Sequence, residues 1–111
     1  MFKLEKKGTV DVIGGDGPLD TDAVEELNLL LEQAVSNGPP RLVFDLTQVP
    51  FIHSKGLEWL LDTHDRCTNL GGRFELANAN SLCRNILRIT AIDHQLETFD
   101  ELTGAVGSFT R

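Results

Sequence analysis

The sequence predicts a single α/β domain built around one mixed, mostly parallel sheet. Two observations carry this prediction. Short strand patterns alternate with amphipathic helical patterns after an opening pair of strands, and the connections are long enough for right-handed βαβ crossovers. We expect four to five strands, about four helices and an antiparallel N-terminal edge. The 111 residues, 41% hydrophobic and 24% charged, have the size and composition of one domain spanning 1–111.

The first 36 residues predict a hairpin followed by a helix. Residues 2–6 and 9–13 alternate apolar and polar side chains around a Lys-Gly turn, as two half-buried strands would. A glycine- and proline-rich segment then breaks regular structure, and Asp22 with Glu25 has the spacing of a capping box. We expect a helix over residues 23–36, with one apolar stripe formed by Val24, Leu27, Leu31, Ala34 and Val35.

The middle of the chain predicts the central strand and the second helix. Residues 42–46 are almost continuously apolar, which is typical of a strand covered on both faces. A second helix is expected from Ser54 to Leu70. Its buried face is predicted to carry Leu57, Leu60, Leu61, His64 and Cys67.

The last third of the chain predicts four shorter elements. The pattern indicates a strand over residues 73–77, a helix over 82–89, an edge strand over 95–99 and a final helix over 100–109. Two glycines make the final helix the weakest of the set.

The charge of the chain argues against nucleic acid and membranes as partners. The formal net charge is -7 and the pI is about 4.8, so phosphate backbones and anionic lipids are repelled, and no run of Lys and Arg opposes this repulsion. The N-terminus lacks the apolar stretch of a signal peptide, and acidic residues interrupt the longest apolar helix. We expect a cytoplasmic protein without membrane insertion.

The sequence offers little support for a metal, a cofactor or an enzyme. Cys67 and Cys83 stand on separate helices without zinc-site spacing, which predicts reduced, packed thiols. The glycines after the hairpin lack the Gly-Lys-Ser/Thr of a phosphate-binding loop. His53 and Ser54 are neighbours in sequence, which does not make them a catalytic pair, and no nucleophile-elbow motif surrounds the serine. We expect His64 to be a packed, hydrogen-bonded core residue.

The most informative stretch is the turn into the second helix, where His53, Ser54, Lys55 and Gly56 follow a buried strand. A phosphate on Ser54 would carry about -1.5 to -2 charges and would meet the positive end of the helix dipole. The alternative is that Ser54 simply caps the helix, since serine is a preferred N-cap residue. The residues alone favour the capping interpretation.

Four segments in order along the chain resemble the STAS domain of bacterial anti-sigma-factor antagonists. They read Gly-Pro-Leu-Asp at 17–20, Leu-Val-Phe-Asp-Leu at 42–46, Phe-Ile-His-Ser-Lys-Gly-Leu at 51–57 and Gly-Gly-Arg-Phe-Glu-Leu at 71–76. The resemblance covers nearly the whole chain. It implies a STAS-type fold and a regulatory protein that is not an enzyme.

The resemblance also implies a phosphorylation site and a partner surface. The family usually reads Asp-Ser-Ser-Gly-Leu at the second helix, and its first serine, which matches Ser54, is phosphorylated by a kinase that is also the anti-sigma factor. A phosphatase reverses the switch. The family's early acidic residue matches Asp20, which we expect near the acceptor on the partner-facing surface, or as a helix cap. This sequence departs from the family pattern at His53 and Lys55, while Gly56 is retained.

Trp59 is a further candidate contact residue. A helical wheel places it on the polar side of the second helix, with Lys55, Asp62 and Arg66. Exposed tryptophans are frequent interface anchors. The alternative is burial of Trp59 against the final helix.

Two alternative functions remain open at the level of the sequence. The first is a phosphorylation-independent STAS subunit of a larger signalling or lipid-transport assembly. The second is a small hydrolase that uses Ser54.

Overall fold

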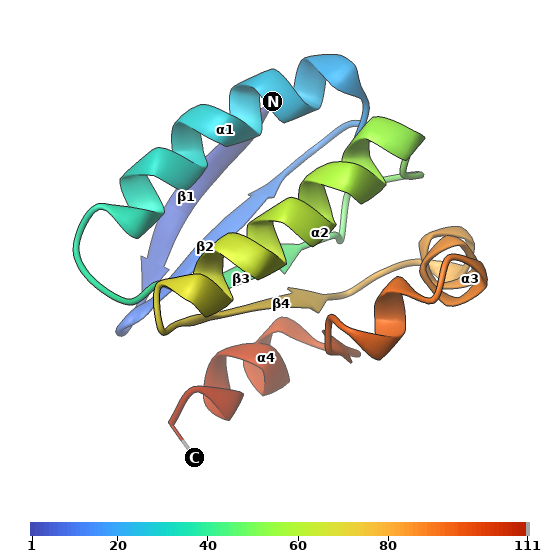
Figure 1. Cartoon of the computed structure of the whole chain (residues 1–111). Helices are drawn as coiled ribbons and strands as arrows, with labels where there is room; N and C mark the ends of the chain where they lie inside the picture. Colours follow the sequence, from blue (N-terminus) through green and yellow to red (C-terminus); the bar gives the residue numbers. More distant parts are fainter. Residues whose placement is uncertain (111) are drawn as a thin grey trace.

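A five-stranded sheet in the order β1-β2-β3-β4-β5 forms the centre of the protein (Figure 1). The structure is a computed structural model and describes residues 1–110. The strands β1 (Phe2–Lys7) and β2 (Val10–Gly15) pair antiparallel. The strands β3 (Arg41–Asp45), β4 (Arg73–Ala77) and β5 (Thr98–Phe99) extend the sheet in parallel from β2. The predicted mixed sheet with an antiparallel N-terminal edge is confirmed.

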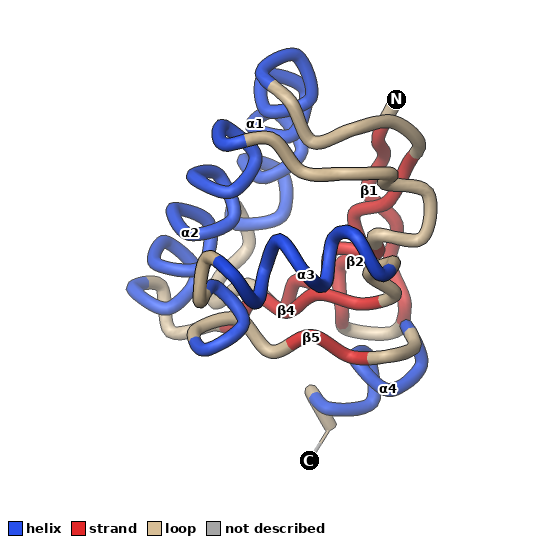
Figure 2. The backbone as a smooth tube through the Cα atoms, turned by 90° about the vertical axis from the view of Figure 1, so that its right-hand side faces the viewer, coloured by secondary structure: helices blue, strands red, loops and turns tan. Residues whose placement is uncertain are grey.

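Helices cover both faces of the sheet and also the end of the sheet at which the parallel strands finish. Helices α1 (Thr21–Val35) and α2 (Ser54–Asn69) lie side by side on one face, and α4 (Leu102–Ser108) lies on the other (Figures 1 and 2). Helix α3 (Ser81–Ile89) lies beyond the edge where β2, β3 and β4 end (Figure 2). The described helices match the expected number, and none is long and apolar enough to cross a membrane.

The final edge strand is shorter than predicted. A 3-10 turn at Ile92–His94 precedes it, and the amides of Gln95 and Leu96 both donate to the carbonyl of Ile92 at 2.9 Å. The chain is therefore still turning at the point where the sequence predicted an extended strand. Strand β5 consists of Thr98–Phe99, which pair with Leu76 and Ala77 of β4.

The central strand is β3, as its apolar sequence predicts. Leu42, Val43 and Phe44 are all fully buried. Leu42 and Phe44 belong to the main core between the sheet and the α1–α2 layer, whereas Val43 belongs to a smaller cluster under α4. Phe44 packs edge-to-face against Phe2 and Trp59, with ring centroids 5.8 Å apart in both pairs.

Helix α1 begins earlier than the predicted capping box. Asp20 is its N-cap residue, and Oδ1 of Asp20 accepts from the amide of Ala23 at 3.0 Å. Asp22 lies in the first turn instead. A carboxylate one residue before the helix already satisfies the first free amides, so the Asp22–Glu25 pair is not needed as a cap.

The buried face of α2 agrees in part with the predicted one: Leu60 and Cys67 are fully buried, and Leu57 and Leu61 pack against the core. The fully buried residues are Gly56, Trp59, Leu60, Thr63 and Cys67, while His64 is only half-buried. Helix α2 packs against α1 as well as the sheet, which turns its buried arc toward the α1 side. Nδ1 of His64 is buried without a hydrogen-bond partner within residues 1–110, so the predicted hydrogen bond of this side chain is wrong.

Both cysteines are free and buried, as predicted. Burial raises the pKa of the Cys67 thiol to about 11, and it also raises that of Cys83. Thiols of this kind are unreactive near neutral pH, because the thiolate is the reactive form.

Candidate functional site

Ser54 is the first residue of α2 and is exposed. The chain leaves β3, runs through the loop 46–53 and enters α2 at the carboxyl-end edge of the sheet, the side that faces the viewer in Figure 2. The N-cap is His53 and not Ser54, so the interpretation of Ser54 as the cap is wrong. The Ser54 hydroxyl thus stands at the positive end of the helix dipole.

A short bridge brings Asp20 and the turn before Ser54 together. Leu19 pairs with Ile52 as an isolated parallel bridge. The amide of Leu19 donates to the carbonyl of Phe51 at 3.1 Å, and the amide of His53 donates to the carbonyl of Leu19 at 2.9 Å. Asp20 therefore lies next in sequence to a residue that is hydrogen-bonded to His53. Its carboxylate caps α1, in agreement with the capping alternative.

Gly56 makes this close approach possible. A Cβ at position 56 would lie 2.5 Å from the carbonyl oxygen of Leu19 and 2.7 Å from its Cβ. Both neighbours are rigid, so a larger residue would push α2 away from the bridge. Gly56 is itself buried, so it shapes the surface around Ser54 and does not present a side chain to a partner.

The two residues that flank Ser54 are exposed and basic in character. The ring of His53 stacks edge-to-face on Phe51 at 5.0 Å and does not cap the helix. Nζ of Lys55 lies 3.8 Å from the carboxylate of Glu58, and the first turn of α2 contains no acidic residue. The surroundings of the Ser54 hydroxyl therefore favour a negative charge.

Trp59 is buried, with 4% of its surface exposed, so the predicted surface contact is wrong. Its ring packs edge-to-face between Phe44 and Phe74, and Nε1 donates to Oδ1 of Asn28 on α1 at 2.9 Å. The predicted alternative, burial against the final helix, is also wrong because α4 covers the other face. The helical wheel failed here because α1 covers the side of α2 that the wheel marks as polar.

Asn80 is a site residue that the sequence analysis missed. It caps α3 through Cys83, and its Nδ2 donates to the carbonyls of Val49 at 3.3 Å and Pro50 at 3.2 Å. It thereby ties α3 to the loop that leads to Ser54. The Asn-Ser pair at 80–81 was a visible helix-start signal, but its second role depends on a contact over 30 residues.

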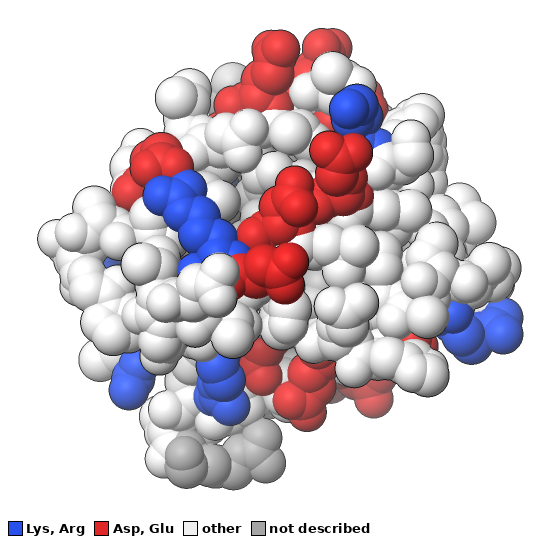
Figure 3. Space-filling view, viewed as in Figure 1, with Lys and Arg blue, Asp and Glu red and all other residues white. Residues whose placement is uncertain are grey.

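Acidic side chains line the exposed ridge of α2 beyond this site (Figure 3). The ridge consists of Glu58, Asp62 and Asp65. Nη2 of Arg66 donates to Glu32 on α1 at 3.0 Å, and this hydrogen bond lowers the pKa of Glu32. Within residues 1–110 no cluster of side chains is arranged to hold a metal ion.

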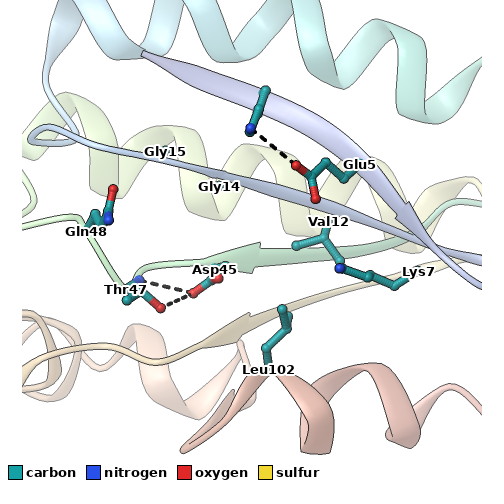
Figure 4. A pocket seen from close by; sticks show the side chains of 10 residues that line it. Glu5, Lys7, Val12, Gly14, Gly15, Asp45, Thr47, Gln48 and Leu102 are labelled. Carbon is teal, nitrogen blue, oxygen red and sulfur yellow. Dashed lines mark hydrogen bonds and ion pairs between the residues drawn. The ribbon is translucent and has the colours of Figure 1, made fainter.

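A hollow of about 360 Å³ lies on the α4 side of the sheet (Figure 4). It is lined by Lys3, Glu5, Lys7, Val12, Gly14, Gly15, Asp45, Thr47, Gln48 and Leu102. Its two carboxylates already have partners: Glu5 pairs with Lys3 at 3.4 Å, and Asp45 accepts from the amide of Thr47 at 3.1 Å. The hollow shares no residue with the surface around Ser54.

The model of the STAS domain family matches residues 1–105. The chain belongs to the STAS domain family. None of the curated protein sequences compared with it matches.

Solved structures of anti-sigma factor antagonists share the fold of this STAS domain protein. The anti-sigma factor antagonist from Mycobacterium paratuberculosis is 23% identical, with a TM-score of 0.87 over 100% of this chain and 94% of that chain. The unphosphorylated form of SpoIIAA is 19% identical, with a TM-score of 0.80 over 99% of this chain and 96% of that chain. Bacillus SpoIIAA has also been solved in its phosphorylated form.

A transporter also contains the fold. The sulfate transporter family protein from Wolinella succinogenes is 19% identical, with a TM-score of 0.76 over 87% of this chain and 81% of that chain. The fold therefore occurs both in anti-sigma factor antagonists and in a transport protein.

Proposed function

We propose that this protein is an anti-sigma-factor antagonist whose binding is switched off by phosphorylation of Ser54. In this proposal the unphosphorylated protein binds a cytoplasmic anti-sigma factor that is also a serine kinase, and thereby frees a sigma factor. The kinase then phosphorylates Ser54, the complex separates, and a serine phosphatase restores the binding form. The observation that carries the proposal is the exposed position of Ser54 at the start of α2.

The free protein is well suited to hold the new charge. The first turn of α2 has no acidic residue and no side-chain cap, so the helix dipole acts on a phosphate without competition. Lys55 and Glu58 form an exposed pair at 3.8 Å, which contributes little to stability. The lysine is therefore free to turn toward a phosphate on Ser54.

The complex is where the phosphate would be unfavourable. A partner packed against the His53–Ser54–Lys55 surface would have to remove water from a group carrying about -1.5 to -2 charges. The same modification is thus tolerated in the free protein and rejected at an interface. The family membership and the phosphorylated structure of SpoIIAA support this interpretation.

The test combines phosphorylation with binding. Each anti-sigma-type serine kinase of the source organism is incubated with the protein and ATP, and Ser54 is examined by mass spectrometry, with Ser54→Ala as the control. Calorimetry then compares wild type, Ser54→Ala and Ser54→Asp. We expect binding by the first two and at least about tenfold weaker binding by Ser54→Asp, with thermal stability within about 0.5 kcal/mol of wild type. Equal binding by Ser54→Asp, with Ser54 left unmodified, would refute the switch.

A constitutive STAS subunit is the second candidate. Two observations favour it: His53 and Lys55 depart from the usual Asp-Ser-Ser pattern, and the fold also occurs in a sulfate transporter family protein. This candidate predicts that the protein binds a larger signalling or transport assembly equally well with serine, alanine or aspartate at position 54. The binding experiment above therefore distinguishes the two candidates, because only the switch predicts weaker binding by Ser54→Asp.

A further inference from the structure

Helix α3 exposes a stripe of large apolar side chains. Leu82 and Ile89 are 52% and 76% exposed, and Ile86, half-buried, lies between them. Their spacing of four and three residues places all three on one face of the helix. A different face of α3, which carries the buried Cys83 and Leu87, packs against the core.

Helix α3, which carries this stripe, lies at the same end of the sheet as the start of α2 (Figure 2). Helix α3 crosses the carboxyl-end edge of the sheet, toward which the loops before α1 and α2 also project (Figure 2). Asn80 and the thiol of Cys83 both donate to the carbonyl of Val49, at 3.3 Å and 3.5 Å. Phe51, 37% exposed, follows in the same loop, and its ring contacts the ring of His53 edge-to-face.

The charge on α3 is opposite in sign to that of the protein as a whole. The helix carries two arginines and no acidic residue, in a chain with a net charge of -7. Arg84 is paired with Asp100 at 2.9 Å. Arg88 donates to Asn85 at 3.2 Å and has no ion pair among residues 1–110.

We infer that α3 is a second docking element for the anti-sigma kinase. An apolar groove on that partner receives Leu82, Ile86 and Ile89, and a carboxylate at the rim of the groove pairs with Arg88. The inference rests on the proposed function, because the kinase that reaches Ser54 must approach this side of the molecule. Apolar side chains exposed in a contiguous stripe commonly mark such interaction sites.

A second copy of the chain fits this face poorly. A two-fold symmetric contact through α3 would place the helix against its own copy. Two unpaired Arg88 side chains would then meet without any carboxylate on either helix. Two domains that each carry a charge of -7 would add a general repulsion.

The test measures binding of variants to the kinase identified through Ser54. The apolar variant is Leu82→Gln with Ile89→Gln, since glutamine is a good helix former of similar length. Its matched control is Leu29→Gln, because Leu29 is 71% exposed on α1 and away from α3. The charge variant is Arg88→Glu, and its control is Arg41→Glu, because Arg41 is exposed at the opposite end of the sheet.

We expect both α3 variants to bind at least about tenfold more weakly than wild type, while the two controls bind within about twofold and all melting curves agree. If wild type binds the kinase and is phosphorylated, but the α3 variants bind equally well, the docking role of α3 is refuted and the proposed function stands. If wild type binds no such kinase, the proposed function fails and the docking role fails with it. If sedimentation shows a dimer of the wild type that Leu82→Gln with Ile89→Gln dissolves, the stripe is a self-association surface instead.

Discussion

Replacing Phe44 by alanine tests the architecture on which the site depends. The side chain is fully buried on the central strand, and its ring packs edge-to-face against Phe2 and Trp59 at 5.8 Å. Truncating a buried phenylalanine costs about 3–5 kcal/mol, and each lost aromatic pair contributes about 0.5–1.5 kcal/mol within that sum. We expect a loss near the upper end of this range. Because small domains are stable by only about 5–15 kcal/mol, the variant should be close to unfolding.

The assay is a urea titration followed by circular dichroism and by tryptophan fluorescence. Trp59 is the only tryptophan in the sequence and contacts Phe44, so its fluorescence reports the core directly. Phe51→Ala is the matched control, because that ring is 37% exposed and its loss should cost less than about 1 kcal/mol. A loss under about 1 kcal/mol for Phe44→Ala, or one equal to that of Phe51→Ala, would show that the α1–α2 layer is not packed as described.

Three further predictions concern single side chains. Gly56→Ala should destabilise by about 1–3 kcal/mol in thermal melts, because the new Cβ meets a carbonyl oxygen at 2.5 Å, whereas Gly107→Ala has open space and should not destabilise. The hydrogen bond from Arg66 lowers the pKa of Glu32, so wild type should be more stable than Glu32→Gln above pH 4.5, and the difference should vanish as acid protonates that carboxylate. Burial raises the pKa of Cys67 from 9.0 to about 11, so iodoacetamide should not label it at pH 8 without urea, and stability should fall as the pH rises from about 9 toward 11.

The sequence predicts the strands well because their signals are local. The apolar run at 42–46 and the alternation at 2–6 each follow from how a strand lies in the sheet beside its one or two neighbours. Both strands could therefore be predicted without knowing where the helices pack. Ser54 was likewise placed correctly at the start of α2, since a strand, a turn and a Ser-Lys-Gly sequence define that position locally. The fold class and the position of Ser54 at the start of α2 were therefore predictable.

The misplacement of Trp59 has a different cause, which is contact between elements far apart in the sequence, and Gly56 shows the same dependence. Trp59 was assigned to a polar face, but α1 covers that face and Asn28 accepts from its indole. Gly56 was expected on the partner surface, whereas its role depends on a carbonyl 37 positions earlier in the chain, at Leu19. A wheel or a motif describes one helix at a time and does not include the neighbour that covers it.

The burial of Trp59 changes what a partner of this surface can use. Stable interfaces bury about 800 Å² on each side, and a few apolar or aromatic anchors supply most of the binding energy. His53, Ser54 and Lys55 are small or polar, and Trp59 is no longer available to them. The apolar side chain beside them is Phe51, which is 37% exposed and contacts His53. Helix α3 adds Leu82 and Ile89, so in the proposed complex a partner bound around Ser54 would gain much of its apolar contact from α3.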